Sequence, residues 1–197
     1  MCGITGHFSK TKLVDKTSCL SMLKTIEHRG PDDSGDYFED RVFLGHQRLS
    51  IIDLTDRGHQ PMWSLDKTIG IVYNGEIYNF KEIKAELPEF QFQSETDTEV
   101  IIYAYKKWGI EKAINKFNGM FSFCLYDKEK RKAFFVRDRI GIKPFVYYWD
   151  KQNFLFASEL KAILQSDVVS RTINPSAVYN YFIYRYIGHP NTIFKNI

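Results

Sequence analysis

Runs of β-branched and aromatic residues lie in two blocks along this chain of 197 residues, with polar turns between the runs. The first block comprises residues 2–9, 38, 42–52 and 68–73, and the second comprises residues 119–126, 132–137, 145–149 and 154–156. Helical spacing of apolar residues occurs between and after the blocks, at residues 18–27, 79–87, 100–108, 159–164 and beyond residue 174. Strands grouped in this way, without alternating βαβ units, indicate an α+β fold with layered antiparallel sheets.

The composition favours one folded domain over a disordered or membrane-spanning chain. Apolar residues make up 44% of the sequence, and 16 Phe, 12 Tyr and 3 Trp can fill a sizeable core. No apolar run approaches the ~18 residues of a membrane span, and the N-terminus lacks a signal-peptide layout, so we expect a cytoplasmic protein. The net charge of +3 involves no Lys/Arg block, which argues against nucleic acid as a partner.

Three patterns predict where helices begin. Residues 79–82 (NFKE) and 96–99 (TDTE) fit capping boxes, with an N-cap side chain and a glutamate three positions on. Asn174 followed by Pro175 fits an N-cap with proline at the first helical position. The helix that follows carries aromatic residues all round it at 179–186 (YNYFIYRY), which is more than one buried face requires.

Position separates one cysteine from the other two. Cys19 and Cys124 lie within apolar patterns, where a free cysteine is usually a small core residue. None of the three forms a CxxC pair or a metal-type spacing with histidine, so we expect neither disulfides nor a bound metal. Cys2 follows Met1 directly. If Met1 is removed, Cys2 gains a free α-amine with an ordinary pKa of about 7.7 to 8.0, which can accept the proton of the thiol on the same residue.

Asn74 and Gly75 allow two interpretations. Asn-Gly after a strand is the strongest short-range signal for a hairpin turn. The same pair can instead form an oxyanion hole, because an asparagine amide and a glycine backbone N–H can both donate to one developing negative oxygen. The residues alone leave both interpretations open.

Seven motifs occur in the order found in class II glutamine amidotransferases. They are residues 2–6 (CGITG), 28–32 (HRGPD), 44–53 (LGHQRLSIID), 74–79 (NGEIYN), 96–99 (TDTE), 119–121 (GMF) and 137–144 (RDRIGIKP), followed by 156–162 (FASELKA) and 192–195 (TIFK). The chain most resembles the glutaminase domain of the glutamine-hydrolysing asparagine synthetase B family. The HRGPD form and Arg48 within QRLS resemble asparagine synthetases more than the hexosamine-phosphate synthase or phosphoribosyl amidotransferase branches.

The resemblance implies an Ntn-hydrolase fold, in which an N-terminal nucleophile begins a central strand of a four-layer αββα sandwich of two antiparallel sheets. It implies that Cys2 attacks the side-chain amide of L-glutamine while its own amine shuttles the proton. Asn74 and Gly75 would hold the oxyanion. Ammonia would then leave, and water would release glutamate from a thioester.

The resemblance also implies a set of substrate contacts. Arg48 matches the position that grips the α-carboxylate, a contact for which a planar guanidinium is suited. Asp97 and Glu76 match positions near the α-ammonium, and Ile51 and Ile52 match a segment that lines the site through its backbone. From the residues alone, Arg48 also fits an ordinary outward arginine, and Asp97 also fits a carboxylate favoured at a helix N-terminus.

Several polar groups receive no chemical role from the sequence. His28 and His46 are expected to be structural, because the mechanism needs no imidazole, and His59 lies in an expected loop. We expect residues 137–144 to form a turn network that supports the site.

The resemblance divides the chain into a glutamine amidotransferase type 2 domain at residues 2–165 and a C-terminal helical segment at 166–197. The segment would lead into an ATP-dependent synthetase domain, whose Ser-Gly-Gly loop does not occur here. We therefore expect no cofactor in this chain, with ATP and Mg²⁺ confined to that domain. The apolar end favours a fragment over a free-standing subunit. Expected partners are L-glutamine and the synthetase domain, in the same chain or as a separate subunit, and a homodimer stays open.

Three classes of function remain at this stage. The first is a glutaminase that feeds ammonia to a ligase, with aspartate or another acceptor. The second is another amidase with an N-terminal cysteine, although such an enzyme has no reason to carry an arginine and an aspartate for an amino-acid backbone. The third is a catalytically silent domain that binds glutamine or a partner protein.

Overall fold

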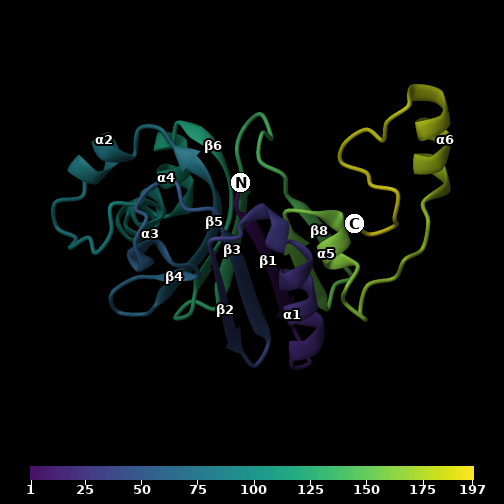
Figure 1. The fold of residues 1–197 in the computed structure, drawn as a ribbon, viewed down its shortest axis with the longest axis horizontal. Helices are drawn as coiled ribbons and strands as arrows, with labels where there is room; N and C mark the ends of the chain where they lie inside the picture. Colours follow the sequence, from purple (N-terminus) through teal and green to yellow (C-terminus); the bar gives the residue numbers. More distant parts are fainter.

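Two antiparallel sheets form the centre of the molecule in the computed structural model, which describes residues 1–197 (Figure 1). The first sheet has the strand order β2 (Asp33–Glu39), β3 (Val42–Arg48), β1 (Gly3–Ser9), β9 (Asn153–Ala157) and β8 (Val146–Trp149). The second sheet has the order β4 (Met62–Trp63), β5 (Ile69–Ile77), β6 (Gly119–Asp127) and β7 (Lys132–Arg137). The predicted α+β class with antiparallel sheets is confirmed.

Helices cover the outer face of each sheet, which makes four layers. The first sheet carries α1 (Lys16–Thr25) and α5 (Leu160–Ile163), and the second carries α2 (Phe80–Ala85), α3 (Asp97–Trp108) and α4 (Ile110–Lys116). Separate clusters of buried apolar side chains join the layers: Met22 and Leu155 belong to the cluster under α1, and Ile4 and Val72 to the one between the sheets. The predicted αββα sandwich is therefore the observed architecture.

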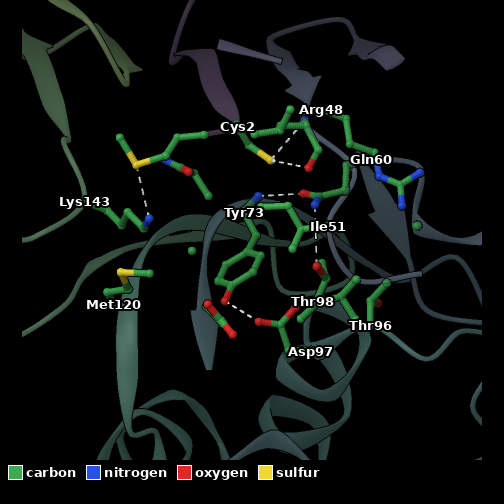
Figure 2. Close-up of a pocket in the computed structure, with 17 residues that line it drawn as sticks. Cys2, Arg48, Ile51, Gln60, Tyr73, Thr96, Asp97, Thr98, Met120 and Lys143 are labelled. Carbon is green, nitrogen blue, oxygen red and sulfur yellow. Dashed lines mark hydrogen bonds between the residues drawn. The ribbon is translucent and has the colours of Figure 1, made fainter. Parts of the chain in front are cut away.

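β1 is the central strand of the first sheet, with β3 on one side and β9 on the other. Thr5 lies opposite Gly45 of β3 and opposite Ala157 of β9. The strand is buried along Gly3–His7, which agrees with the apolar and small residues of its sequence. Its N-terminal end places Cys2 where the two sheets meet (Figures 1 and 2).

The course of β5 distinguishes the two interpretations of Asn74 and Gly75, a hairpin turn or an oxyanion hole. The strand continues through both residues, and they lie opposite Ser122 and Phe121 of β6, so the hairpin interpretation is wrong. The reason is long-range: nine consecutive residues of β5 pair with β6, and this ladder outweighs a local preference for a turn. A Cβ atom on Gly75 would lie 2.5 Å from the Met120 carbonyl oxygen, so only glycine lets the strands approach this closely.

β3 is shorter than the predicted strand at residues 42–52, because it ends at Arg48. The backbone beyond it bonds to the loop before β2 and to the first residues of the chain: Ser50 N–H donates to the Asp32 carboxylate at 2.7 Å. Leu49 N–H donates to the Cys2 sulfur at 3.4 Å. Ile51 and Ile52 therefore lie in irregular backbone.

Two of the three predicted N-cap side chains make the expected hydrogen bond, and the third does not. Thr96 accepts a hydrogen bond from Glu99 N–H at 3.4 Å and Asn174 accepts one from Ser176 N–H at 3.2 Å, as predicted. α2 begins directly after Asn79, as predicted, but the Asn79 side chain makes no cap hydrogen bond. It instead joins α2 to the end of α4 through the backbone of Lys116 and Asn118. The Glu99 carboxylate accepts from the backbone of the preceding loop, at Gln93 and Ser94, so the box at 96–99 is only half formed.

The C-terminal segment carries α6 (Pro175–Tyr184), which stands apart from the layered body in Figure 1. Only Ala177 of this helix is buried, whereas Tyr179, Phe182 and Tyr184 are 61 to 75% exposed. The end of the chain returns to the first sheet, where Trp149 N–H donates to the Asn196 carbonyl at 3.3 Å. No helix in the chain has the length and apolar character needed to cross a membrane.

Candidate active site

One pocket at the N-terminal end of β1 contains all eight residues that the sequence singles out: Cys2, Arg48, Ile51, Ile52, Asn74, Gly75, Glu76 and Asp97. They come from the residue before β1, from β3, the loop after β3, β5 and the first turn of α3, which are far apart in the sequence (Figure 2). The pocket has a volume of about 100 Å³. This is well below the several hundred Å³ of sites for large ligands, so it suits a small molecule.

The pocket lies against an open stretch of the edge of β5. β4 covers that edge only at Ile71 and Gly70. Further along, Tyr73 N–H donates to the Gln60 side chain at 2.7 Å and Ile77 N–H donates to the Asp97 carboxylate at 2.9 Å. Backbone N–H groups two residues apart point to the same edge of a strand, so the N–H of Gly75 points to this edge, between the other two.

Asn74 is the neighbouring donor. Its side-chain nitrogen is buried and has no hydrogen-bond partner in the chain. A buried amide without a partner costs about 1 to 3 kcal/mol, so such groups are rare unless a ligand or water meets them. Asn74 and Gly75 therefore supply two adjacent N–H donors at the pocket.

Asp97 lies at the start of α3 and is almost fully buried. One carboxylate oxygen, Oδ2, accepts hydrogen bonds from the Tyr73 hydroxyl at 2.6 Å and from Ile77 N–H. Burial raises the pKa of this carboxyl, and these two donors counteract part of the rise. The other oxygen has no hydrogen bond from a side chain, so the carboxylate is oriented and can accept from a cationic ligand.

Arg48 is also buried, at the end of β3. Its guanidinium donates to the main-chain carbonyls of Thr55, at 2.9 Å, and of Asp53. A Cβ atom on Gly58 would overlap this guanidinium, so glycine at that position makes room for it. Each terminal nitrogen has a second hydrogen, which leaves donors for a carboxylate. The outward orientation that the residues alone allowed is excluded.

The Cys2 thiol lies in the same pocket and donates to the Leu49 carbonyl at 3.6 Å. Burial raises its pKa above the ordinary value, while the Leu49 backbone, the N-terminal amine, Arg48 and Lys143 act in the opposite direction. The carbonyl of Cys2 is held by Arg29, whose Nε donates to it at 3.0 Å. Met1 precedes Cys2 here, so the nitrogen of Cys2 is a peptide nitrogen.

The sequence reasoning missed several residues that line this pocket. Among them are Gln60, Tyr73, Thr98, Met120 and Lys143. Tyr73 and Gln60 organise the β5 edge, as described above, and Lys143 belongs to the motif at 137–144. Tyr73 precedes Asn74 on the same strand, but consecutive side chains of a strand point to opposite faces, so the alternation gave no sign that both residues line one pocket. For Gln60 no signal existed, since a loop residue reaches the edge of β5 only through the tertiary fold.

The groups without an expected chemical role have structural contacts. His46 is fully buried and donates from Nε2 to the Tyr73 carbonyl at 3.1 Å, and burial lowers its pKa to about 4. His28 contacts Glu159 at 2.9 Å, and His59 contacts Asp33 at 2.8 Å. The predicted turn network is present: the Asp138 carboxylate accepts from the N–H groups of Phe121, Ile140, Gly141, Ile142 and Lys143.

A thiol residue that heads a central strand, between two antiparallel sheets with helices outside, defines the Ntn-hydrolase class of fold. The structure of a glutamine phosphoribosylpyrophosphate amidotransferase from Bacillus subtilis shares this fold, with a TM-score of 0.70 at 18% identity over 82% of this chain and 43% of that one.

Sequence comparison then identifies the family. The profile of the glutamine amidotransferase domain matches residues 1–197, and the chain belongs to that family. It is 38% identical, over its full length, to "Asparagine synthetase [glutamine-hydrolyzing] 3" of Bacillus subtilis, and 41% identical, over 88% of its length, to "Asparagine synthetase B [glutamine-hydrolyzing]" of Escherichia coli. The chain spans 33% and 31% of these two relatives, so it corresponds to about a third of each.

Proposed function

We propose that this chain is the glutaminase part of an asparagine synthetase-like amidotransferase, and that it hydrolyses L-glutamine to glutamate and ammonia. The observation that carries the proposal is the single pocket that joins a thiol, an unpartnered buried amide and two oriented groups of opposite charge. The names of the relatives support glutamine as the substrate.

The substrate is proposed to lie across the pocket with its charged end away from the thiol. Arg48 donates to the α-carboxylate, and Asp97 accepts from the α-ammonium, with Glu76 contributing to the negative side of the pocket. Ile51 and Ile52 bound the same end through the loop after β3. The two fixed charges favour a zwitterionic amino acid, which an amidase for uncharged acylamides does not require.

The chemistry uses groups of the chain itself. After Met1 is removed, the α-amine of Cys2 takes the thiol proton, and the sulfur attacks the side-chain carbonyl carbon of glutamine. The N–H groups of Asn74 and Gly75 stabilise the oxyanion. Its collapse breaks the C–N bond, and the leaving nitrogen takes the proton from the amine and departs as ammonia. Water then adds to the thioester, and glutamate leaves as the sulfur regains a proton.

The remaining two thirds of such a protein would use the ammonia. We propose that a following domain binds ATP and Mg²⁺ and activates a carboxylate, with aspartate as the first acceptor to test because both relatives are named asparagine synthetases. A free thiol nucleophile persists most readily in a reducing compartment, and we propose a cytoplasmic location on this ground.

The exposed face of α6 is proposed to contact that following domain. Tyr179, Phe182 and Tyr184 expose most of their surface, and the relatives extend well beyond the length of this chain. Hydrogen exchange on the longer protein and on residues 1–197 alone tests this, with slower exchange at 179–186 expected in the longer protein. Equal exchange at 179–186 in the two proteins would contradict this contact. If residues 1–197 sediment as a dimer, the exposed face of α6 would instead be assigned to a second copy of the chain.

Glutamate and ammonia release from glutamine, measured for the wild type and for Cys2→Ala, tests the function. We expect loss of activity in Cys2→Ala and retention in Cys19→Ala, a matched control at a fully buried cysteine of α1. Intact mass must show that Met1 is absent. Retained Met1 together with glutamine binding would support the silent binding domain, and equal rates for wild type and Cys2→Ala would refute the thioester mechanism.

A further inference from the structure

Lys143 is a buried cation that the proposed mechanism leaves without a role. The residue is 5% exposed and lines the pocket that contains Cys2. No ion pair of the molecule includes it. The only hydrogen bond of its ammonium is to the sulfur of Met1, at 3.3 Å (Figure 2), and a thioether is a weak acceptor. Buried lysines are almost always paired, so this arrangement calls for an explanation.

The backbone around Lys143 is fixed on both sides. Its N–H donates to the Asp138 carboxylate at 3.0 Å, and its carbonyl accepts from Arg137 Nε at 2.6 Å. The Asp138 carboxylate also accepts from three other N–H groups of the same loop. These hydrogen bonds involve only the main chain of Lys143, and they hold the residue at the pocket. They therefore do not explain why its side chain carries a positive charge there.

We propose that Lys143 is a positioning residue of the glutamine site that acts electrostatically through Cys2, where its ammonium favours the thiolate and the neutral α-amine. The inference rests on the proposed function. Removal of Met1 would free the ammonium from its only partner and create the α-amine in the same pocket. Two neighbouring cations repel, so the amine would lose its proton more readily and could act as a base near neutral pH.

The electrostatics around the thiol agree with this role. Burial raises the pKa of the Cys2 thiol, and Lys143 is one of the few groups that lower it. The other charged or titratable groups at the pocket or on Cys2 are Arg29 before β2, Arg48 on β3, Tyr73 and Glu76 on β5, and Asp97 on α3. Arg29 pairs with Glu159, and Arg48 donates to two carbonyls. Glu76 and Asp97 carry the same sign as a thiolate, which leaves Lys143 as the cation without another partner or proposed role.

Two measurements on the Met1-processed, full-length protein test the inference. The first is the pH dependence of Cys2 alkylation by iodoacetamide, followed by peptide mass, and the second is the pH profile of kcat/KM for glutamine. Lys143→Gln is expected to move both profiles to higher pH by about one unit, with a loss of about tenfold below the transition and little change in KM. Lys143→Arg is expected to retain the wild-type profiles, and so is Lys112→Gln, the same change at an exposed lysine of α4.

The outcomes separate this inference from the proposed function. Unshifted alkylation and kcat/KM profiles in Lys143→Gln would overturn the inference. A rise in KM alone would also overturn it, because Lys143 would then contact the substrate. If the wild type releases no glutamate, the proposed function fails, while the alkylation profile still decides whether Lys143 acts on the thiol.

Discussion

Two asparagines five residues apart provide a sharp test of the site, because the structure gives them opposite roles. The Asn74 amide is buried without a partner, whereas the Asn79 side chain donates to the Lys116 carbonyl at 2.9 Å and accepts from Asn118 N–H at 2.9 Å. The same substitution to alanine should therefore separate activity from stability at the two positions.

For Asn74→Ala we expect kcat/KM for glutamine to fall about 10²- to 10³-fold, the usual loss for one oxyanion donor. The free energy of unfolding should change by less than about 1 kcal/mol, because relief of an unpaired amide offsets the lost packing. For Asn79→Ala we expect the reverse: kcat/KM within about threefold of wild type, and a loss of about 1 to 2 kcal/mol from two hydrogen bonds.

The measurements are steady-state glutamate release and urea unfolding followed by circular dichroism. Activity within threefold of wild type in Asn74→Ala would refute the oxyanion role. A loss of more than about 2 kcal/mol in the same variant would refute the claim that its amide is unpartnered. Equal activity losses in two folded variants would show that the pocket is disturbed in general.

Three further predictions concern neighbouring residues. Gly58→Ala should displace the Arg48 guanidinium and raise KM for glutamine by about tenfold or more with the fold intact, which kinetics and circular dichroism can check. Tyr73→Phe removes the 2.6 Å hydrogen bond to Asp97, so KM should rise about tenfold while kcat stays within about threefold, and an unchanged KM would contradict this. His46 has a pKa of about 4 in the folded protein against an ordinary 6.5, so the unfolded chain binds the proton first as the pH falls. The contribution of the neutral His46 to the free energy of unfolding should be fully present above pH 6.5 and should decrease by up to about 3 kcal/mol by pH 4. Urea unfolding at several pH values would measure this decrease, and His46→Gln should lack this part of it.

Local patterns predicted most elements because they depend on neighbours along the chain. Alternating or β-branched runs gave strands near the predicted bounds for β6 and β7, and an asparagine before a proline gave the start of α6. At Asn79 the pattern gave the correct start of α2 but not the cap, because the Asn79 side chain bonds to the end of α4 instead of its own helix. A capping pattern names an available acceptor, but a distant backbone group can compete for it.

In the pocket, too, the sequence predicted some features and the tertiary structure decided others. The motifs named Cys2, Arg48 and Asp97, and the structure brings these residues together. They did not indicate that Tyr73 and Ile77 orient Asp97, because those contacts depend on the exposed edge of β5.

The sequence by itself determined the two blocks of strands, the resemblance to amidotransferases and the nucleophile candidate at position 2. The tertiary structure alone decided that Asn74 and Gly75 lie within a strand, because pairing of β5 with β6 along nine residues outweighs a local turn preference. It also decided that Lys143 is buried in the pocket that contains Cys2, without a counter-ion. Periodicity can show which face of a strand is apolar, but only the packing of distant segments decides which charges share a pocket.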